Sequence, residues 1–166
     1  MKTSLLTSLL ILVCSFATIS CSNDSEDLVD GSNPQLITEY AYNNDETQLL
    51  DAINNYRESQ GKNPLIMINH MSYKSQEHNL YMIEKNVVNH DFFHERSSNI
   101  IEVLGAIKVA ENVAYNYNNA NSVLNAWLNS PDHKKNLDGE YTHIGISITV
   151  NTTNGKKYYT NMFMRK

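Results

Sequence analysis

Residues 144–164 read IGISITVNTTNGKKYYTNMFM, and this stretch decides the fold class. From Ile144 to Val150 every second residue is large and apolar, and the residues between them are small or polar. That period of two predicts a half-buried β-strand. The Asn-Gly pair at 154–155 is a strong hairpin signal. We therefore expect residues 158–164 to return as a second, antiparallel strand.

The residues upstream of this hairpin follow helical spacing. Asp45 and Gln48 predict a capping box, and the apolar residues after them recur at intervals of three and four. The same reasoning predicts a loop over residues 89–98, a helix end at Ser130-Pro131, and helices over 46–60, 70–86, 99–104 and 121–129. Helices followed by a terminal hairpin indicate an α+β layered domain with an antiparallel sheet.

The first 21 residues read as an export signal, because Lys2 precedes an apolar run that is too short to favour a membrane span. Thr18-Ile19-Ser20-Cys21 resembles a bacterial lipoprotein processing box. We expect lipidation at Cys21 and a stable membrane anchor, with Cys14 as the alternative cysteine and an ordinary cleaved secretory signal as the alternative reading. The expected location is the cell envelope, as an outer-membrane or cell-surface lipoprotein.

The remaining chain divides into a linker and a domain. Residues 22–44 are acidic and polar without a strong period, which predicts a flexible linker. Residues 45–166 are long enough to build one domain with its own hydrophobic core. The net charge of −5 argues against a nucleic-acid partner. Both cysteines, at 14 and 21, precede this domain, so it has neither a disulfide framework nor a thiol nucleophile.

Three short motifs remain as candidates for chemistry: NHDFF at 89–93, AENVA at 110–114 and WLNSPDHKKNL at 127–137. Their order and spacing resemble the CAP superfamily, also called the SCP family, and most closely its bacterial secreted branch. The resemblance spans residues 46–163. It implies an α-β-α sandwich with a small antiparallel sheet, in agreement with the periodicity.

The resemblance also implies a site. Relatives from animals and plants carry two histidines and two acidic residues in a shallow cleft, where the four can bind a divalent metal, often zinc. His90, Glu111 and His133 match three of these positions, and Ser130 stands where the fourth acid would be. Asp132 is near enough in sequence to replace that acid. Two imidazoles and a carboxylate with an open position are a plausible catalytic zinc site, so Zn²⁺ is the candidate cofactor. Loss of the fourth acid leaves weak occupancy or a vestigial site as alternatives.

Each of these residues also has a structural interpretation. Glu111 could hydrogen-bond backbone amides, His133 could cap the preceding helix, and His90 could only fix its own loop. His78 lies on an apolar helix stripe and is expected to be a core histidine.

Three functions follow from these readings. The favoured one is a surface binding module for a small ligand, a lipid or a peptide. The alternative is a hydrolase, peptidase-like, that uses His90, Glu111 and His133 as catalytic residues, with or without a metal. The third is an interaction protein in which the cleft is a relic.

Overall fold

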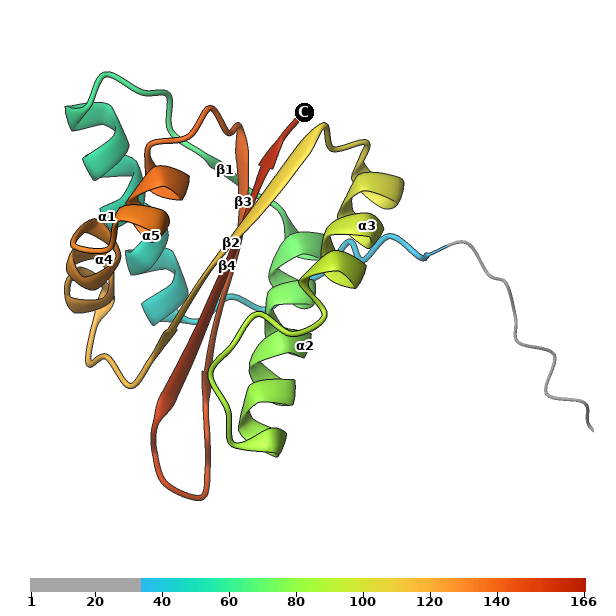
Figure 1. Cartoon of the computed structure of the whole chain (residues 1–166), viewed down its shortest axis with the longest axis vertical. Coiled ribbons are helices and arrows are strands. Elements are labelled where there is room, and N and C mark those ends of the chain that lie inside the picture. Colours follow the sequence, from blue (N-terminus) through green and yellow to red (C-terminus); the bar gives the residue numbers. More distant parts are fainter. Residues whose placement is uncertain (1–33) are drawn as a thin grey trace, which may run out of the picture. The chain divides into compact units, whose positions relative to one another are not determined.

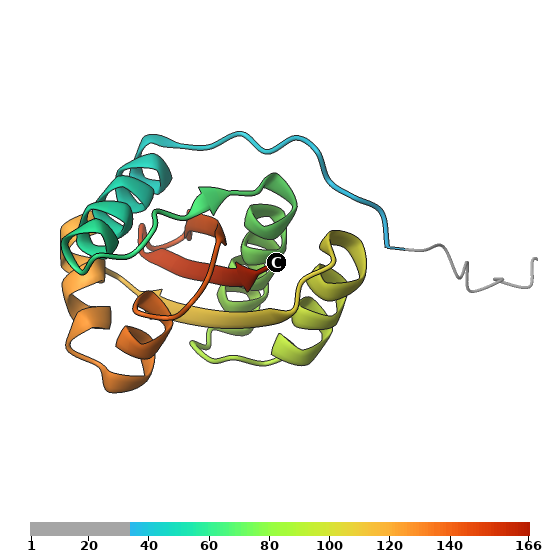
Figure 2. The same ribbon diagram turned by 90° about the horizontal axis from the view of Figure 1, so that it is seen from above.

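The computed structural model describes residues 34–166, which form a three-layer α-β-α sandwich (Figure 1). One central sheet separates two groups of helices, and Figure 2 shows the same layers from above. The expected α+β class and sandwich architecture are confirmed. The export signal, the lipidation cysteine Cys21 and the first part of the expected linker lie outside the described residues.

Nine elements make up the described chain: α1 (Asn44–Ser59), β1 (Ile66–Met67), α2 (Asn69–Lys85), α3 (Phe93–Leu104), β2 (Lys108–Tyr115), α4 (Ala120–Leu128), α5 (Pro131–Leu137), β3 (His143–Val150) and β4 (Lys157–Arg165). The strand order is β1-β3-β4-β2. Strands β2, β4 and β3 are antiparallel, as predicted, and the two-residue β1 joins β3 in parallel. The sheet is therefore mixed, and β2 is one of its edges.

The terminal hairpin forms as predicted, but both of its faces are covered. Ile144, Ile146 and Ile148 pack toward α1 and α4 with Phe163, in the largest of the three core clusters of the described residues. On the other face α2 lies directly against Gly145, where an added Cβ would sit 2.3 Å from the backbone of Met71. The expectation of a half-buried strand was wrong. Helix α2 packs against the small residues between the isoleucines, so this face of the strand is buried as well.

Helix α1 begins earlier than predicted and uses a different cap. The side chain of Asn43 accepts a hydrogen bond from the Glu46 backbone N–H, and Glu46 accepts one from the Asn43 N–H in return. The predicted capping box at Asp45 and Gln48 was wrong. Glu46 takes the role because its buried carboxylate also accepts hydrogen bonds from the Ile148 N–H and the Tyr40 hydroxyl.

Three further expectations differ from the structure. Helix α3 begins at Phe93, so the second half of the predicted loop 89–98 is helical. Ser130-Pro131 starts α5 as well as following α4, because proline is well suited to the first turn of a helix. Residues 108–115, which carried no clear period, form strand β2.

Residues 34–43, expected to belong to the linker, lie against the domain. The Ile37 N–H donates to Nδ1 of the buried His70 (3.1 Å), and Asn69 Nδ2 donates to the Thr38 carbonyl (2.6 Å). The Tyr42 hydroxyl donates to Asn69 Oδ1 (2.9 Å). These contacts tie the segment to the start of α2. Within residues 34–166, none of the helices combines the length and apolar character needed to cross a bilayer.

Candidate functional site

The centre of the site is Glu111 on the edge strand β2. Its side chain points toward the α2 and α3 layer and is 2% exposed. Arg96, from the first turns of α3, donates from Nε to Glu111 Oε2 and from Nη2 to Oε1, both at 2.9 Å. Burial makes an isolated carboxylate costly, and a bidentate guanidinium is the partner best able to offset that cost.

His90 completes this group from the loop between α2 and α3. Its Nδ1 lies 2.7 Å from Glu111 Oε1. Because Arg96 holds Glu111 as a carboxylate, we assign the proton to His90 Nδ1, which donates to the acid. The other ring nitrogen, Nε2, belongs to a side chain that is 52% exposed. The arrangement presents an oriented imidazole at the protein surface.

The loop that carries His90 is held at several points. Arg96 Nη1 donates to the Asp91 carbonyl (2.7 Å), so the same guanidinium fixes both the loop and the acid. The Asp91 carboxylate accepts from the Tyr81 hydroxyl (2.8 Å) and from Asn89 Nδ2 (2.7 Å). Phe92 adopts a left-handed conformation with φ +58°, which is costly for an aromatic residue. This turn lets α3 start at once and bring Arg96 back over Glu111.

His78 lies behind Glu111 in the core, as expected. Its Nδ1 is 3.1 Å from Thr160 Oγ1 and 3.7 Å from Glu111 Oε2. The Thr160 hydroxyl donates to Asn79 Oδ1, so His78 Nδ1 must donate to Thr160. Burial lowers the pKa of His78 to about 4, against the opposing effect of the Glu111 charge. His78 is therefore neutral at neutral pH and does not compete for the Glu111 carboxylate.

His133 reaches the same region from the opposite helical layer. Burial lowers its pKa, and the nearby His90 lowers it further. Helix α5 is fastened to β2 by two asparagines: Asn112 Nδ2 donates to the His133 carbonyl (3.1 Å), and Asn136 Nδ2 donates to the Glu111 carbonyl (3.1 Å). The position of His133 thus depends on the strand that carries Glu111.

A hollow of about 460 Å³ opens beside His133. Its walls are mainly apolar and come from the loop before His90, from β2 and from α4: Val88, Val113, Ala114, Tyr115, Tyr117, Ala126, Trp127, Ser130 and His133. Val88 lies two residues before His90, so the loop of one histidine and the helix of the other border the same space. A ligand here would meet an apolar wall with imidazole at its edge.

The predicted three-residue metal site does not fit this arrangement. Both oxygens of Glu111 already accept hydrogen bonds from Arg96, and Oε1 also accepts from His90. Among residues 34–166, no three or more His, Cys, Asp or Glu side chains form a group able to hold a metal ion. A cation at Glu111 would have to displace a bidentate guanidinium. Zinc binding by His90, Glu111 and His133 stays a prediction.

The structural alternatives for the same residues can also be compared with the structure. Glu111 binds side chains rather than backbone amides, and His133 belongs to α5 rather than capping α4. Sequence reasoning missed Arg96, because it fell within the predicted loop. It also assigned no role to the Asn112–Asn136 pair, whose side chains join at 2.8 Å.

Comparison with known proteins gives consistent results. The model of the CAP family, described as the cysteine-rich secretory protein family, matches residues 50–163. An uncharacterized membrane protein, YlbC, from Bacillus subtilis (strain 168) is 37% identical over 60 residues, which cover 36% of this chain and 16% of that protein. The match therefore spans only a small part of that relative.

Solved structures share the fold. An outer surface protein from Borrelia burgdorferi is 20% identical with a TM-score of 0.67, covering 78% of this chain and 99% of that one. An extracellular protein containing an SCP domain from Bacillus anthracis str. Ames is 26% identical with a TM-score of 0.63, covering 74% and 40%. A cysteine-rich secretory protein from Staphylococcus aureus is 22% identical with a TM-score of 0.62, covering 74% and 38%.

Proposed function

This chain belongs to the cysteine-rich secretory protein family, and we propose that it is a cell-surface binding module whose cleft takes a ligand with an apolar segment and a polar head. The observation that carries the proposal is the apolar hollow with the imidazole of His133 at its border. The hollow is lined by Trp127, Val113 and Ala126, and His133 stands at its border. Ligand sites in proteins commonly combine such an apolar wall with a few oriented polar groups.

The polar groups of the cleft are suited to recognition. His90 is held by Glu111, whose charge Arg96 offsets, so its ring is fixed and its Nε2 is free to meet a ligand. His133 is a neutral imidazole at neutral pH, because burial lowers its pKa. A head group that donates hydrogen bonds would be recognised without the cost of burying a new charge.

The surface location is part of the same proposal. The expected lipid anchor at Cys21 would hold the domain at a membrane, and about a dozen residues separate it from the first described residue, Pro34. Two of the structural neighbours are an outer surface protein and an extracellular protein, which supports an exposed position for this chain.

The test uses Trp127, the single tryptophan of the chain, as a reporter inside the hollow. The full chain is titrated with dodecanoate, for lipids, and with N-acetyl-leucinamide, for peptides, and Trp127 fluorescence is recorded. We expect one probe to give a saturable change, and its identity indicates the ligand class. No change with either probe would overturn the proposal.

A matched pair of variants on α4 locates the binding. Ala126→Phe fills the hollow and should abolish the response, whereas the neighbouring Asn125 is exposed, so Asn125→Phe should preserve it. Calorimetry with the same probe checks that the fluorescence change reports binding. Equal binding by both variants would place the probe elsewhere and refute the assignment.

A hydrolase remains the second candidate, because Glu111 orients the imidazole of His90. That pair can act as a general base on water or on a substrate hydroxyl. The discriminating experiment follows hydrolysis of N-acetyl-leucine p-nitroanilide by the wild type and by His90→Ala. Turnover that disappears in a folded His90→Ala protein would favour the hydrolase, whereas binding without turnover favours the binding module.

A further inference from the structure

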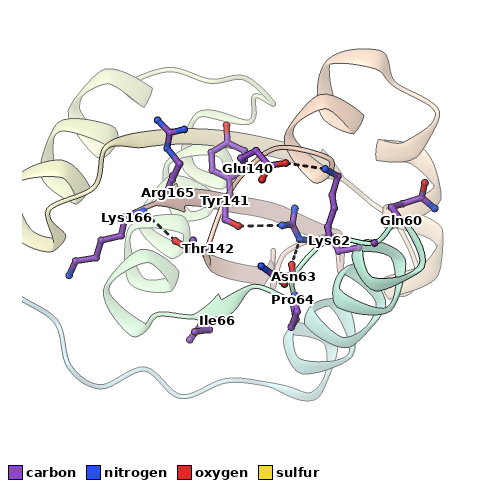
Figure 3. A pocket seen from close by; sticks show the side chains of 12 residues that line it. Gln60, Lys62, Asn63, Pro64, Ile66, Glu140, Tyr141, Thr142, Arg165 and Lys166 are labelled. Atoms are coloured by element: carbon purple, nitrogen blue, oxygen red, sulfur yellow. Dashed lines mark hydrogen bonds and ion pairs between the residues drawn. The ribbon is translucent and has the colours of Figure 1, made fainter.

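A second hollow, of about 560 Å³, lies apart from the residues of the cleft. It is formed by the loop that follows α1, the segment that precedes β3, and the end of β4 (Figure 3). Neither His90, Glu111 nor His133 lines it. The proposed function does not use this hollow, so its purpose is a separate question.

The hollow gathers positive charge in a chain whose net charge is −5. Glu140 is the one acidic side chain among its lining residues. Four basic side chains line it: Arg57, Lys62, Arg165 and Lys166. Lys62 pairs with Glu140 at 3.2 Å, but the Glu140 side chain is 84% exposed, so water and salt screen that pair. Within the described chain, neither Arg165 nor Lys166 forms an ion pair.

Arg57 supplies a buried positive charge beneath the hollow. It is 2% exposed, and its guanidinium donates to the backbone carbonyls of Asn63 (2.9 Å), Leu137 (2.8 Å) and Gly139 (3.0 Å). Carbonyl oxygens satisfy its hydrogen bonds but do not cancel its charge. A charge held away from water acts more strongly on a nearby anion than an exposed one does.

A like-charge pair adds to this potential at the end of the sheet. Lys108 on β2 is directly opposite Arg165 on β4 in the strand register. Like charges in that position destabilise a sheet. Lys108 Nζ lies over the Tyr141 ring, 5.0 Å from its centre, and Tyr141 itself lines the hollow. Figure 3 shows Arg165 beside Tyr141, with Lys62 on the far side near Glu140.

We propose that this hollow is a second binding site, and that it takes a phosphate-bearing ligand. The basic side chains around it outnumber the one acidic side chain, so a group with more than one negative oxygen fits better than a single carboxylate. Bound phosphate would relieve the repulsion between Lys108 and Arg165, and arginine and lysine are the usual donors to phosphate oxygens. The volume leaves room for an organic group attached to the phosphate.

The source of the phosphate is either a free phosphorylated molecule or a lipid headgroup, and two probes separate them. The full chain is titrated by calorimetry, at constant ionic strength, with inorganic pyrophosphate and with dihexanoyl phosphatidylglycerol below its micelle concentration. Saturable binding of pyrophosphate indicates a free phosphorylated ligand. Binding of the short-chain lipid alone indicates a headgroup. Binding of neither probe overturns the proposal.

Charge-matched variants test whether the hollow is responsible. The double variant Lys62→Gln/Arg165→Gln should weaken binding by about tenfold or more, because each lost cation removes a charge-assisted hydrogen bond. The control Lys85→Gln/Lys135→Gln removes the same charge from exposed positions outside the hollow and should change binding by less than about twofold. Equal weakening in both variants would show attraction to general charge and refute the site. Lys62→Gln/Arg165→Gln should keep the Trp127 fluorescence response to the cleft probe. Failure of the phosphate-site proposal can therefore be distinguished from failure of the proposed binding function of the cleft.

Discussion

Replacing Arg96 by methionine tests whether the buried ion pair organises the cleft. As whole residues, Arg96 is 8% exposed and Glu111 is 7% exposed. Removing one partner of a buried pair typically costs about 3–5 kcal/mol, because the other charge stays behind. Because His90 remains as a partner for Glu111, we expect the loss of the ion pair to cost an amount at the lower end of this range. The lost hydrogen bond from Arg96 to the Asp91 carbonyl adds about 1 kcal/mol to that cost. We expect Arg96→Met to lower the free energy of unfolding by about 4 kcal/mol.

The second variant separates the charge effect from the loss of packing. Glu111→Gln in the Arg96→Met background removes the unpaired charge and should recover about 2 kcal/mol. Unfolding in guanidinium chloride is followed by the fluorescence of Trp127, which is 1% exposed in the folded state. Lys135→Met is the control, since it removes one positive charge from an exposed position. A loss below about 1 kcal/mol in Arg96→Met, or no recovery in the double variant, would refute the reasoning.

Three further outcomes are expected. Burial lowers the pKa of His78 from its ordinary 6.5 to about 4, so between these values only the unfolded chain takes up that proton. The free energy of unfolding should therefore drop between pH 7 and pH 5 by about 2 kcal/mol more in the wild type than in His78→Asn. Denaturation curves that change in parallel in the two proteins would contradict this. Asn136→Asp removes the donor that fastens α5 to β2 and should cost about 2 kcal/mol in unfolding experiments, whereas Asn125→Asp on the exposed side of α4 should cost little. Zinc titrated into the wild type should show no stoichiometric binding by calorimetry, because Arg96 occupies both Glu111 oxygens; stoichiometric zinc that disappears in a folded His90→Ala/His133→Ala variant would restore the predicted metal site.

Local patterns predicted the elements whose signals are themselves local. The alternation after Ile144 and the Asn-Gly turn located β3 and β4, and apolar spacing located α1, α2 and α4 to within two residues. The predicted boundaries and caps were wrong where a residue distant in sequence determined them. Glu46 became the capping acid because the Ile148 N–H, 102 residues away along the chain, also binds its carboxylate.

The sequence also predicted some residues of the candidate site and missed others. His90, Glu111 and His133 were located by their motifs, and the structure joins His90 to Glu111 directly. Arg96 carried no signal of its own, because an arginine six residues after a histidine can point anywhere until the backbone between them is known. The left-handed turn at Phe92 is what directs it onto the acid.

By itself, then, the sequence determined the layered α+β class, the hairpin, most helices and the motif residues of the cleft, because periodicity and turn chemistry act between near neighbours along the chain. Only the tertiary structure decided the partners. It paired Glu111 with Arg96, and it brought Arg57, Lys62 and Arg165 together around a second hollow. Charges separated by tens of residues interact only after the sheet and helices have packed, and their energies depend on burial and distance, which no local pattern records.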